Sequence, residues 1–213
     1  MLLLLLLFQI KFNHGADPNV ELQFDEEGSC YAIATQPIAP GSELLVSYGD
    51  PSNASQLFAK YGFLDPNSPA TFCKMTKFQQ TTKMMDIGLD YSRMLFYHDT
   101  GDVSEEVWDV VLYDLLKADR DAQENFYRAH MSGDYQTKQA FHQQYILQTS
   151  TVIKNHVDLF LDQLEALSAK TINQDINVHP RIPVIREHNQ YIRETFLKVK
   201  DQIDALVYQT VTS

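Results

Sequence analysis

The spacing of apolar residues changes along this chain, and that change limits the possible folds more than any other feature. Up to about residue 48, the run 20–24 alternates apolar and polar residues, which is typical of a β-strand, and 30–34 can return as its partner strand after a turn at 25–28. Residues 44–48 are expected to form a third strand. Beyond about residue 75, apolar residues recur every three or four positions, which indicates amphipathic helices. The sequence therefore predicts an α+β chain, with a small β-fold followed by an all-α part.

A proline-containing loop at 66–69 separates these two parts, and we place the domains at residues 1–72 and 73–213. Pro51-Ser52-Asn53 is expected to open a short helix that Gly62 ends. In the second part we expect a helix over 83–97 with an interruption at Gly88, and another that begins after the N-cap Ser104. Further helices are expected over 120–130 and over 141–167. A loop with Pro180 and Pro183 then leads to the last expected helix, from Ile185 onward.

Charge and cysteine content exclude several classes of function. The net charge is −11 and there is no basic block, so binding of nucleic acid is not expected, whereas a basic protein segment would be attracted. Cys30 and Cys73 are the two cysteines, and they form no Cys-x-x-Cys pair, so we predict no metal site and two plain thiols in a reducing, intracellular compartment. The sequence does not distinguish cytoplasm, nucleus and plastid.

The apolar run Leu2–Phe8 allows three interpretations. It is too short to span a bilayer, which takes roughly 20 apolar residues. No basic residue precedes it and no small-residue cleavage site follows it, so a buried strand is favoured over a secretory signal. The third interpretation is that Met1 is not the natural start of the protein.

Five short motifs occur in a fixed order and together carry a resemblance. They are Asn13-His14, Pro18-Asn19, the turn Ile38-x-Pro-Gly-x-Glu-Leu44, Ser47-Tyr48-Gly49 and Tyr61-Gly62-Phe63. This set resembles the C-terminal half of a SET-domain protein-lysine methyltransferase. The segment from Ser52 to Phe63, with the helical tail behind it, is similar to the branch typified by the Rubisco large-subunit methyltransferase, whose helical domain binds the protein substrate.

The resemblance implies an activity and a set of site residues. The activity is transfer of a methyl group from S-adenosyl-L-methionine to a lysine of a protein substrate. Tyr48 matches the catalytic tyrosine, and the resemblance places Asn13, His14 and Tyr48 at the cofactor and Val46, Tyr61 and Phe63 along the channel for the substrate lysine.

The residue types themselves fit these roles but also allow structural ones. The Tyr48 hydroxyl at a strand end, beside Gly49, can aim an amine, although an isolated tyrosine there would more often cover the sheet edge. Tyr61 and Phe63 can form aromatic walls or a core pair. No carboxylate or second histidine has a spacing that would make His14 a metal ligand or general base.

One element of the SET pattern is absent from this sequence. The family carries a Gly-x-Gly segment for the cofactor upstream of Asn-His, whereas this chain contains no Gly-x-Gly and only 12 residues before Asn13. We therefore expect the chain to be a fragment. The alternative is a non-catalytic module that binds a protein partner through its helices, with the SET remnant as scaffold.

Overall fold

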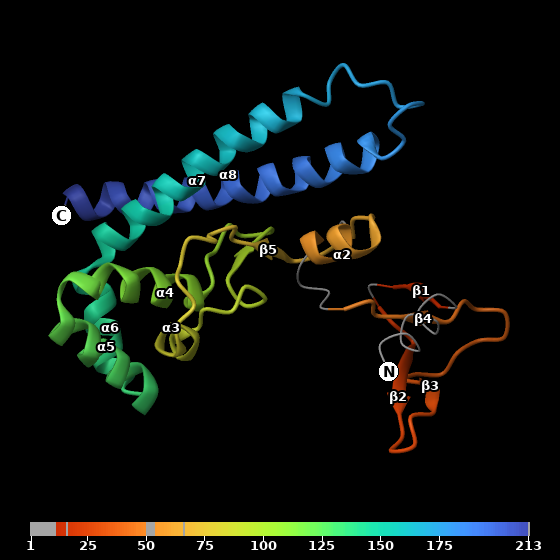
Figure 1. Ribbon diagram of the computed structural model, residues 1–213, viewed down its shortest axis with the longest axis horizontal. Coiled ribbons are helices and arrows are strands. Elements are labelled where there is room, and N and C mark those ends of the chain that lie inside the picture. The colour runs from red at the N-terminus through yellow and green to blue at the C-terminus, as the bar shows by residue number, and fades with distance from the viewer. Residues whose placement is uncertain (1–11, 16, 50–53, 66, 213) are drawn as a thin grey trace. The chain divides into compact units, whose positions relative to one another are not determined.

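The computed structural model describes residues 12–15, 17–49, 54–65 and 67–212. The chain divides into two compact units, Met1–Ser68 and Pro69–Ser213 (Figure 1). Two predicted features, the strand at Leu2–Phe8 and the N-cap at Ser52 or Asn53, lie outside the described residues.

An antiparallel hairpin in the first unit confirms two of the predicted strands. Strand β2 (Val20–Phe24) pairs with β3 (Cys30–Ala34), with Val20 opposite Ala34 and Phe24 opposite Cys30. Asp25 closes the turn, because its carboxylate accepts a hydrogen bond of 2.8 Å from the amide of Ser29. That hydrogen bond lowers the pKa of Asp25. The turn residues therefore fix the register of the hairpin.

A second, parallel pair brings two sequence motifs together. Strand β1 (Asn13–His14) lies beside β4 (Leu45–Val46), with His14 opposite Val46. β4 is shorter than the expected strand over 44–48. Gly15 permits the close approach, since a Cβ at this position would lie 2.9 Å from the Cβ of Leu45. The helix α2 (Ala54–Tyr61) then follows and ends at Gly62, whose φ is 77°.

The second unit is mostly helical. Its longest helices, α7 (Ile146–Ala169) and α8 (Ile182–Thr212), run side by side (Figure 1). Fully buried Phe196 of α8 stacks on Phe160 of α7, with ring centroids 4.3 Å apart. The other elements are β5 (Ala70–Phe72), α3 (Thr82–Ile87), β6 (Leu95–Tyr97), α4 (Glu105–Leu115), the 3-10 helix η1 (Leu116–Ala118), α5 (Arg120–Ser132) and α6 (Tyr135–Gln144).

The expected helix over 83–97 is wrong beyond Gly88. Gly88 has a φ of 120° and ends α3, and the residues Leu95–Tyr97 pair antiparallel with β5 instead. Ser104 precedes α4 but makes no side-chain cap. Its hydroxyl donates to the carbonyl of Arg93 at 2.9 Å and accepts from the amide of Leu95 at 3.0 Å, so it fastens β6 to the start of α4.

Two further helix boundaries differ from the expected ones. The apolar stripe over 141–167 spans two helices, because the backbone leaves the helical conformation at Tyr145, which has a φ of −109° and a ψ of 14°. The last helix begins at Ile182 and includes Pro183 in its first turn. Proline is tolerated there because the first amides of a helix have no intrahelical partner. Of the described helices, none is long and apolar enough to cross a membrane.

Four charged side chains join α7 to α8. Lys154 and Asp158 of α7, and Lys200 and Asp204 of α8, alternate so that each ammonium lies near both carboxylates. The hydrogen bond from Lys200 lowers the pKa of Asp158, and the one from Lys154 lowers the pKa of Asp204. We call these four residues the charge clasp.

The charge clasp predicts a specific pH dependence of stability. A carboxyl pKa that is lower in the folded chain stabilises the fold above the unfolded pKa, and this stabilisation is lost as pH falls through the folded value. The paired side chains are about one-third exposed, so we expect only about 1 kcal/mol from the clasp. Urea unfolding of an Asp158→Asn/Asp204→Asn variant between pH 3 and 7 should show a shallower loss of stability in acid than wild type. Asp162→Asn, an exposed position on α7, is the control and should leave the slope unchanged.

Candidate functional site

Four aromatic rings from separate parts of the first unit lie together. The closest pair is Tyr48 and Tyr61, whose centroids are 4.7 Å apart, and the His14 ring lies 5.6 Å from Tyr48 and 5.5 Å from Phe63. His14 comes from β1, Tyr48 follows β4, and Tyr61 and Phe63 come from the end of α2 and the residues behind it. We call these four residues the aromatic cluster. Three motifs predicted from the sequence therefore meet at one place.

Hydrogen bonds to other described residues hold Tyr48 within the aromatic cluster. Its amide donates to Nδ1 of His14 at 3.3 Å, and its carbonyl accepts from the Tyr61 hydroxyl, also at 3.3 Å. Its own hydroxyl donates to the carbonyl of Phe12. A phenol oxygen both donates its one hydrogen and accepts hydrogen bonds, so a tyrosine hydroxyl is chemically suited to meet an N–H group.

The other two predicted site residues lie beside the cluster. Val46 is buried, and its carbonyl accepts from the amide of Gly15 at 3.2 Å. The exposed Asn13 side chain donates to the Glu43 carboxylate. The structure thus brings His14, Tyr48, Tyr61 and Phe63 together, while the Asn13 amide is engaged outside the cluster. The functional roles of all six residues stay predictions.

Asp65 is a site residue that the sequence analysis did not single out. Its Oδ2 lies 3.5 Å from Nε2 of His14, and both side chains are only 8% exposed. Asp65 follows Phe63 by two positions, but in the sequence it is far from His14. A spacing pattern could not have revealed this contact, because it depends on how the chain returns after α2.

A cavity adjoins the strand that leads to Tyr48. Its volume is about 410 Å³, and its lining includes Val20, Leu22 and Phe24 of β2 together with Val46 and Ser47. Sites for small molecules commonly have volumes of roughly 300–1,000 Å³ and a mainly apolar lining. The first unit therefore offers space for a ligand beside Val46 and Ser47, the two residues that precede Tyr48.

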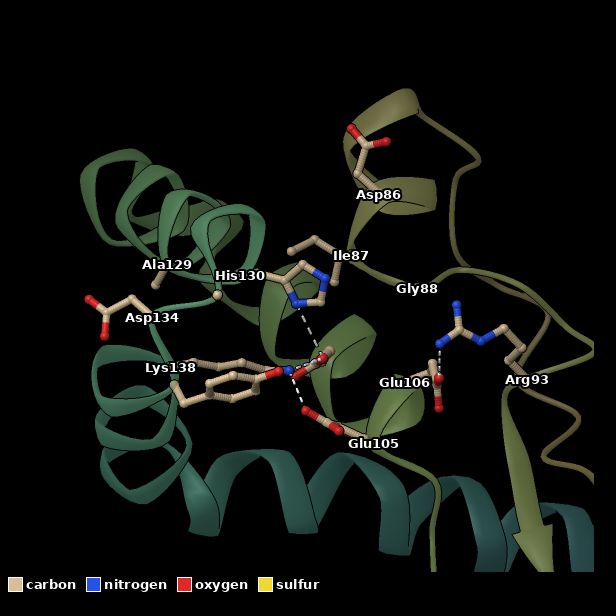
Figure 2. Close-up of a pocket in the computed structure, with 13 residues that line it drawn as sticks. Asp86, Ile87, Gly88, Arg93, Glu105, Glu106, Ala129, His130, Asp134 and Lys138 are labelled. Carbon is tan, nitrogen blue, oxygen red and sulfur yellow. Dashed lines mark hydrogen bonds and ion pairs between the residues drawn. The ribbon is translucent and has the colours of Figure 1, made fainter.

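A second cavity, of about 230 Å³, lies among the helices of the second unit (Figure 2). At its base the buried carboxylate of Asp109 accepts from Lys138 Nζ at 2.6 Å, and His142 Nε2 lies 2.8 Å and His130 Nδ1 3.4 Å from it. Burial opposes the charge on Lys138, but hydrogen bonds to Asp109 and Glu105 raise its pKa. Asp109 therefore links α4 to α5 and α6.

The carboxylates around this second cavity all have partners within the protein. Glu105 pairs with Lys138 and Glu106 with Arg93. Asp86 accepts from the Tyr127 hydroxyl at 2.7 Å, and Asp134 accepts from the Thr137 amide at 3.1 Å as the cap of α6. Because its charges are satisfied internally, we interpret this cluster as structural.

The buried cysteine does not have the character of a reactive thiol. Both cysteines are free, Cys30 half-buried and Cys73 buried. Burial raises the pKa of Cys73 to about 12, which disfavours the nucleophilic thiolate. Among the described residues, no group of three or more His, Cys, Asp or Glu side chains could hold a metal ion.

Comparison with known proteins connects the first unit to one family. Residues 9–49 match the SET domain. A SET and MYND domain-containing protein of Dictyostelium discoideum is 38% identical over 56 residues, which are 24% of this chain and 16% of that protein. No solved structure matches significantly. The SET match includes Asn13, His14, Val46 and Tyr48, whereas Tyr61 and Phe63 lie beyond it.

Proposed function

From the SET-domain match, we propose that this chain is part of an S-adenosyl-L-methionine-dependent protein-lysine methyltransferase. The observation that carries the proposal is the position of Tyr48 among His14, Tyr61 and Phe63, with its hydroxyl directed by the Phe12 carbonyl. The aligned segment covers a small part of the Dictyostelium protein, so the activity proposed is that of a whole protein to which this chain contributes.

The residues present fit the cofactor in two respects. The electron-rich faces of Tyr48 and Tyr61 suit a sulfonium cation, in the same way that aromatic rings hold quaternary ammonium groups. The 410 Å³ cavity beside Val46 gives room for a bound molecule. We assign cofactor contacts to Asn13, His14 and Tyr48. When bound, S-adenosyl-L-methionine supplies an electrophilic methyl group on sulfur.

The task of this chain is then to present a neutral lysine amine in the correct direction. Lysine has an ordinary pKa near 10.4, so its ammonium must lose a proton before it can attack. The rings of the aromatic cluster offer apolar faces for the aliphatic stem, and exclusion of water by the bound substrate favours the neutral amine. We assign the role of accepting the amine N–H bonds to the hydroxyl oxygen of Tyr48 and to the carbonyl oxygen of Val46, two residues earlier in the chain. These acceptors aim the nitrogen lone pair at the methyl carbon.

The finer assignment rests on the resemblance. We place the chain in the Rubisco large-subunit methyltransferase-like branch, with residues 73–213 as the domain that binds the protein substrate. The acidic net charge of −11 favours a basic segment around the target lysine.

A second candidate function is a non-catalytic module that binds a protein partner. The observation that favours this function is the position of the Asn13 side chain. Its amide is exposed and donates to the Glu43 carboxylate instead of facing the aromatic cluster. In that case the SET-like unit is a scaffold, and binding of the partner survives the loss of Tyr48 and Asn13.

Two measurements on the whole protein that contains this chain test the proposal. Isothermal titration with S-adenosyl-L-methionine should show binding, and methyl transfer to a peptide array should occur at lysine and not at arginine placed in the same contexts. A folded whole protein that binds no cofactor would contradict the proposal and favour the interaction module.

A further inference from the structure

We infer that Asp65 is a positioning residue that holds Tyr48 in place through the ring of His14. The inference rests on the proposed function for the importance of Tyr48, but its structural part stands on contacts within the first unit. Asp65 lies outside the segment that matches the SET domain.

The hydrogen bonds of His14 determine where its ring hydrogen must be. Nδ1 accepts the backbone N–H of Tyr48 at 3.3 Å, so it carries no hydrogen of its own. The hydrogen of the neutral ring is therefore on Nε2, and Nε2 is the atom that lies 3.5 Å from Oδ2 of Asp65. A carboxylate on this side stabilises the tautomer that the Tyr48 amide requires.

The position of the Asp65 carboxylate is itself fixed locally. Its Oδ1 accepts from the amide of Asn67 at 2.9 Å, and its carbonyl accepts from the amide of Ser68 at 3.1 Å. This turn keeps one carboxylate oxygen occupied and leaves Oδ2 toward His14. Because both side chains are 8% exposed, water competes little for the contact.

The separation of 3.5 Å is longer than a full hydrogen bond, and His14 Nε2 has no other hydrogen-bond partner among the described residues. Contacts of catalytic sites are often long without ligand and shorten when it binds. We therefore expect Asp65 to close on His14 when the site is filled. The contact then transmits no proton and serves only to fix the ring and, through it, the Tyr48 backbone.

Nitrogen NMR of the histidine-labelled chain tests this inference without any turnover. Two-bond correlations from the ring protons show which nitrogen of His14 carries the hydrogen, and wild type should show the Nε2–H form. Asp65→Asn has a single acceptor oxygen, and with that oxygen on the Asn67 amide its NH2 group faces Nε2, so this variant should lose the Nε2–H form. Asp65→Ala should also lose it and shift the amide signal of Tyr48, whereas Asp17→Ala, at an exposed site in the same unit, should change neither.

Two results would overturn the inference. One is an Nδ1–H tautomer in wild type, which remains decisive even where Asp65→Ala does not fold. The other is a folded Asp65→Ala variant with an unchanged His14 tautomer and an unchanged Tyr48 amide signal. Failure of the proposed function appears separately, as lack of cofactor binding and methyl transfer in the whole wild-type protein while the His14 tautomer is still Nε2–H.

Discussion

Replacing Tyr48 by phenylalanine is expected to lower the rate of methyl transfer by about 100-fold or more, because misdirection of a reacting group by about 1 Å has effects of that size. The substitution keeps the ring, and with it the contacts at 4.7 Å to Tyr61 and 5.6 Å to His14. It removes the oxygen that we propose to accept the amine N–H, together with the hydrogen bond from that hydroxyl to the Phe12 carbonyl. The measurement is kcat with a lysine peptide at saturating S-adenosyl-L-methionine.

Two matched substitutions separate this effect from a general loss of structure. Tyr31→Phe removes the hydroxyl of a tyrosine that is 53% exposed and donates to Asp25, so it should leave kcat unchanged. Tyr61→Phe removes the hydrogen bond to the Tyr48 carbonyl and should lower kcat less than Tyr48→Phe does. Full activity of Tyr48→Phe would refute the aiming role of its hydroxyl.

The parts of the fold that the sequence predicted are those determined by local patterns. The strand over 20–24 follows from apolar alternation and its partner over 30–34 from the turn with Gly28 between them, and both strands are confirmed. The helix that ends at Gly62 was predicted from cap residues at its start and the glycine at its end. The meeting of His14 with Tyr48 was expected only because the ordered motifs resembled those of a family in which they meet.

The parts that the sequence did not predict depend on contacts between distant residues. The pairing of Phe72 with Leu95 is not visible in either strand alone, because each has only three residues. The break at Tyr145 has no glycine or proline to mark it, so the apolar stripe continues through it. The contact between Asp65 and His14 has the same origin, and no sequence motif marks Asp65.

Replacing Asp109 by alanine is expected to lower the free energy of unfolding of the second unit by about 3–5 kcal/mol, the range found when one partner of a buried ion pair is removed. Asp109 is only 2% exposed and accepts from Lys138 at 2.6 Å. Its loss leaves the Lys138 ammonium with Glu105 alone, whose side chain is 68% exposed. Urea unfolding can be followed by the fluorescence of Trp108, the single tryptophan, which precedes Asp109 on α4.

A control and a double variant show whether the unpaired charge is the cause. Asp114→Ala removes an exposed partner of Lys117 on the same helix and should change stability by no more than about 1 kcal/mol. Asp109→Ala combined with Lys138→Met removes both charges, so it should be less destabilising than the sum of the two single variants. Strict additivity would mean that Asp109 stabilises the helices chiefly through His130 and His142, whose ring nitrogens lie 3.4 and 2.8 Å from its carboxylate.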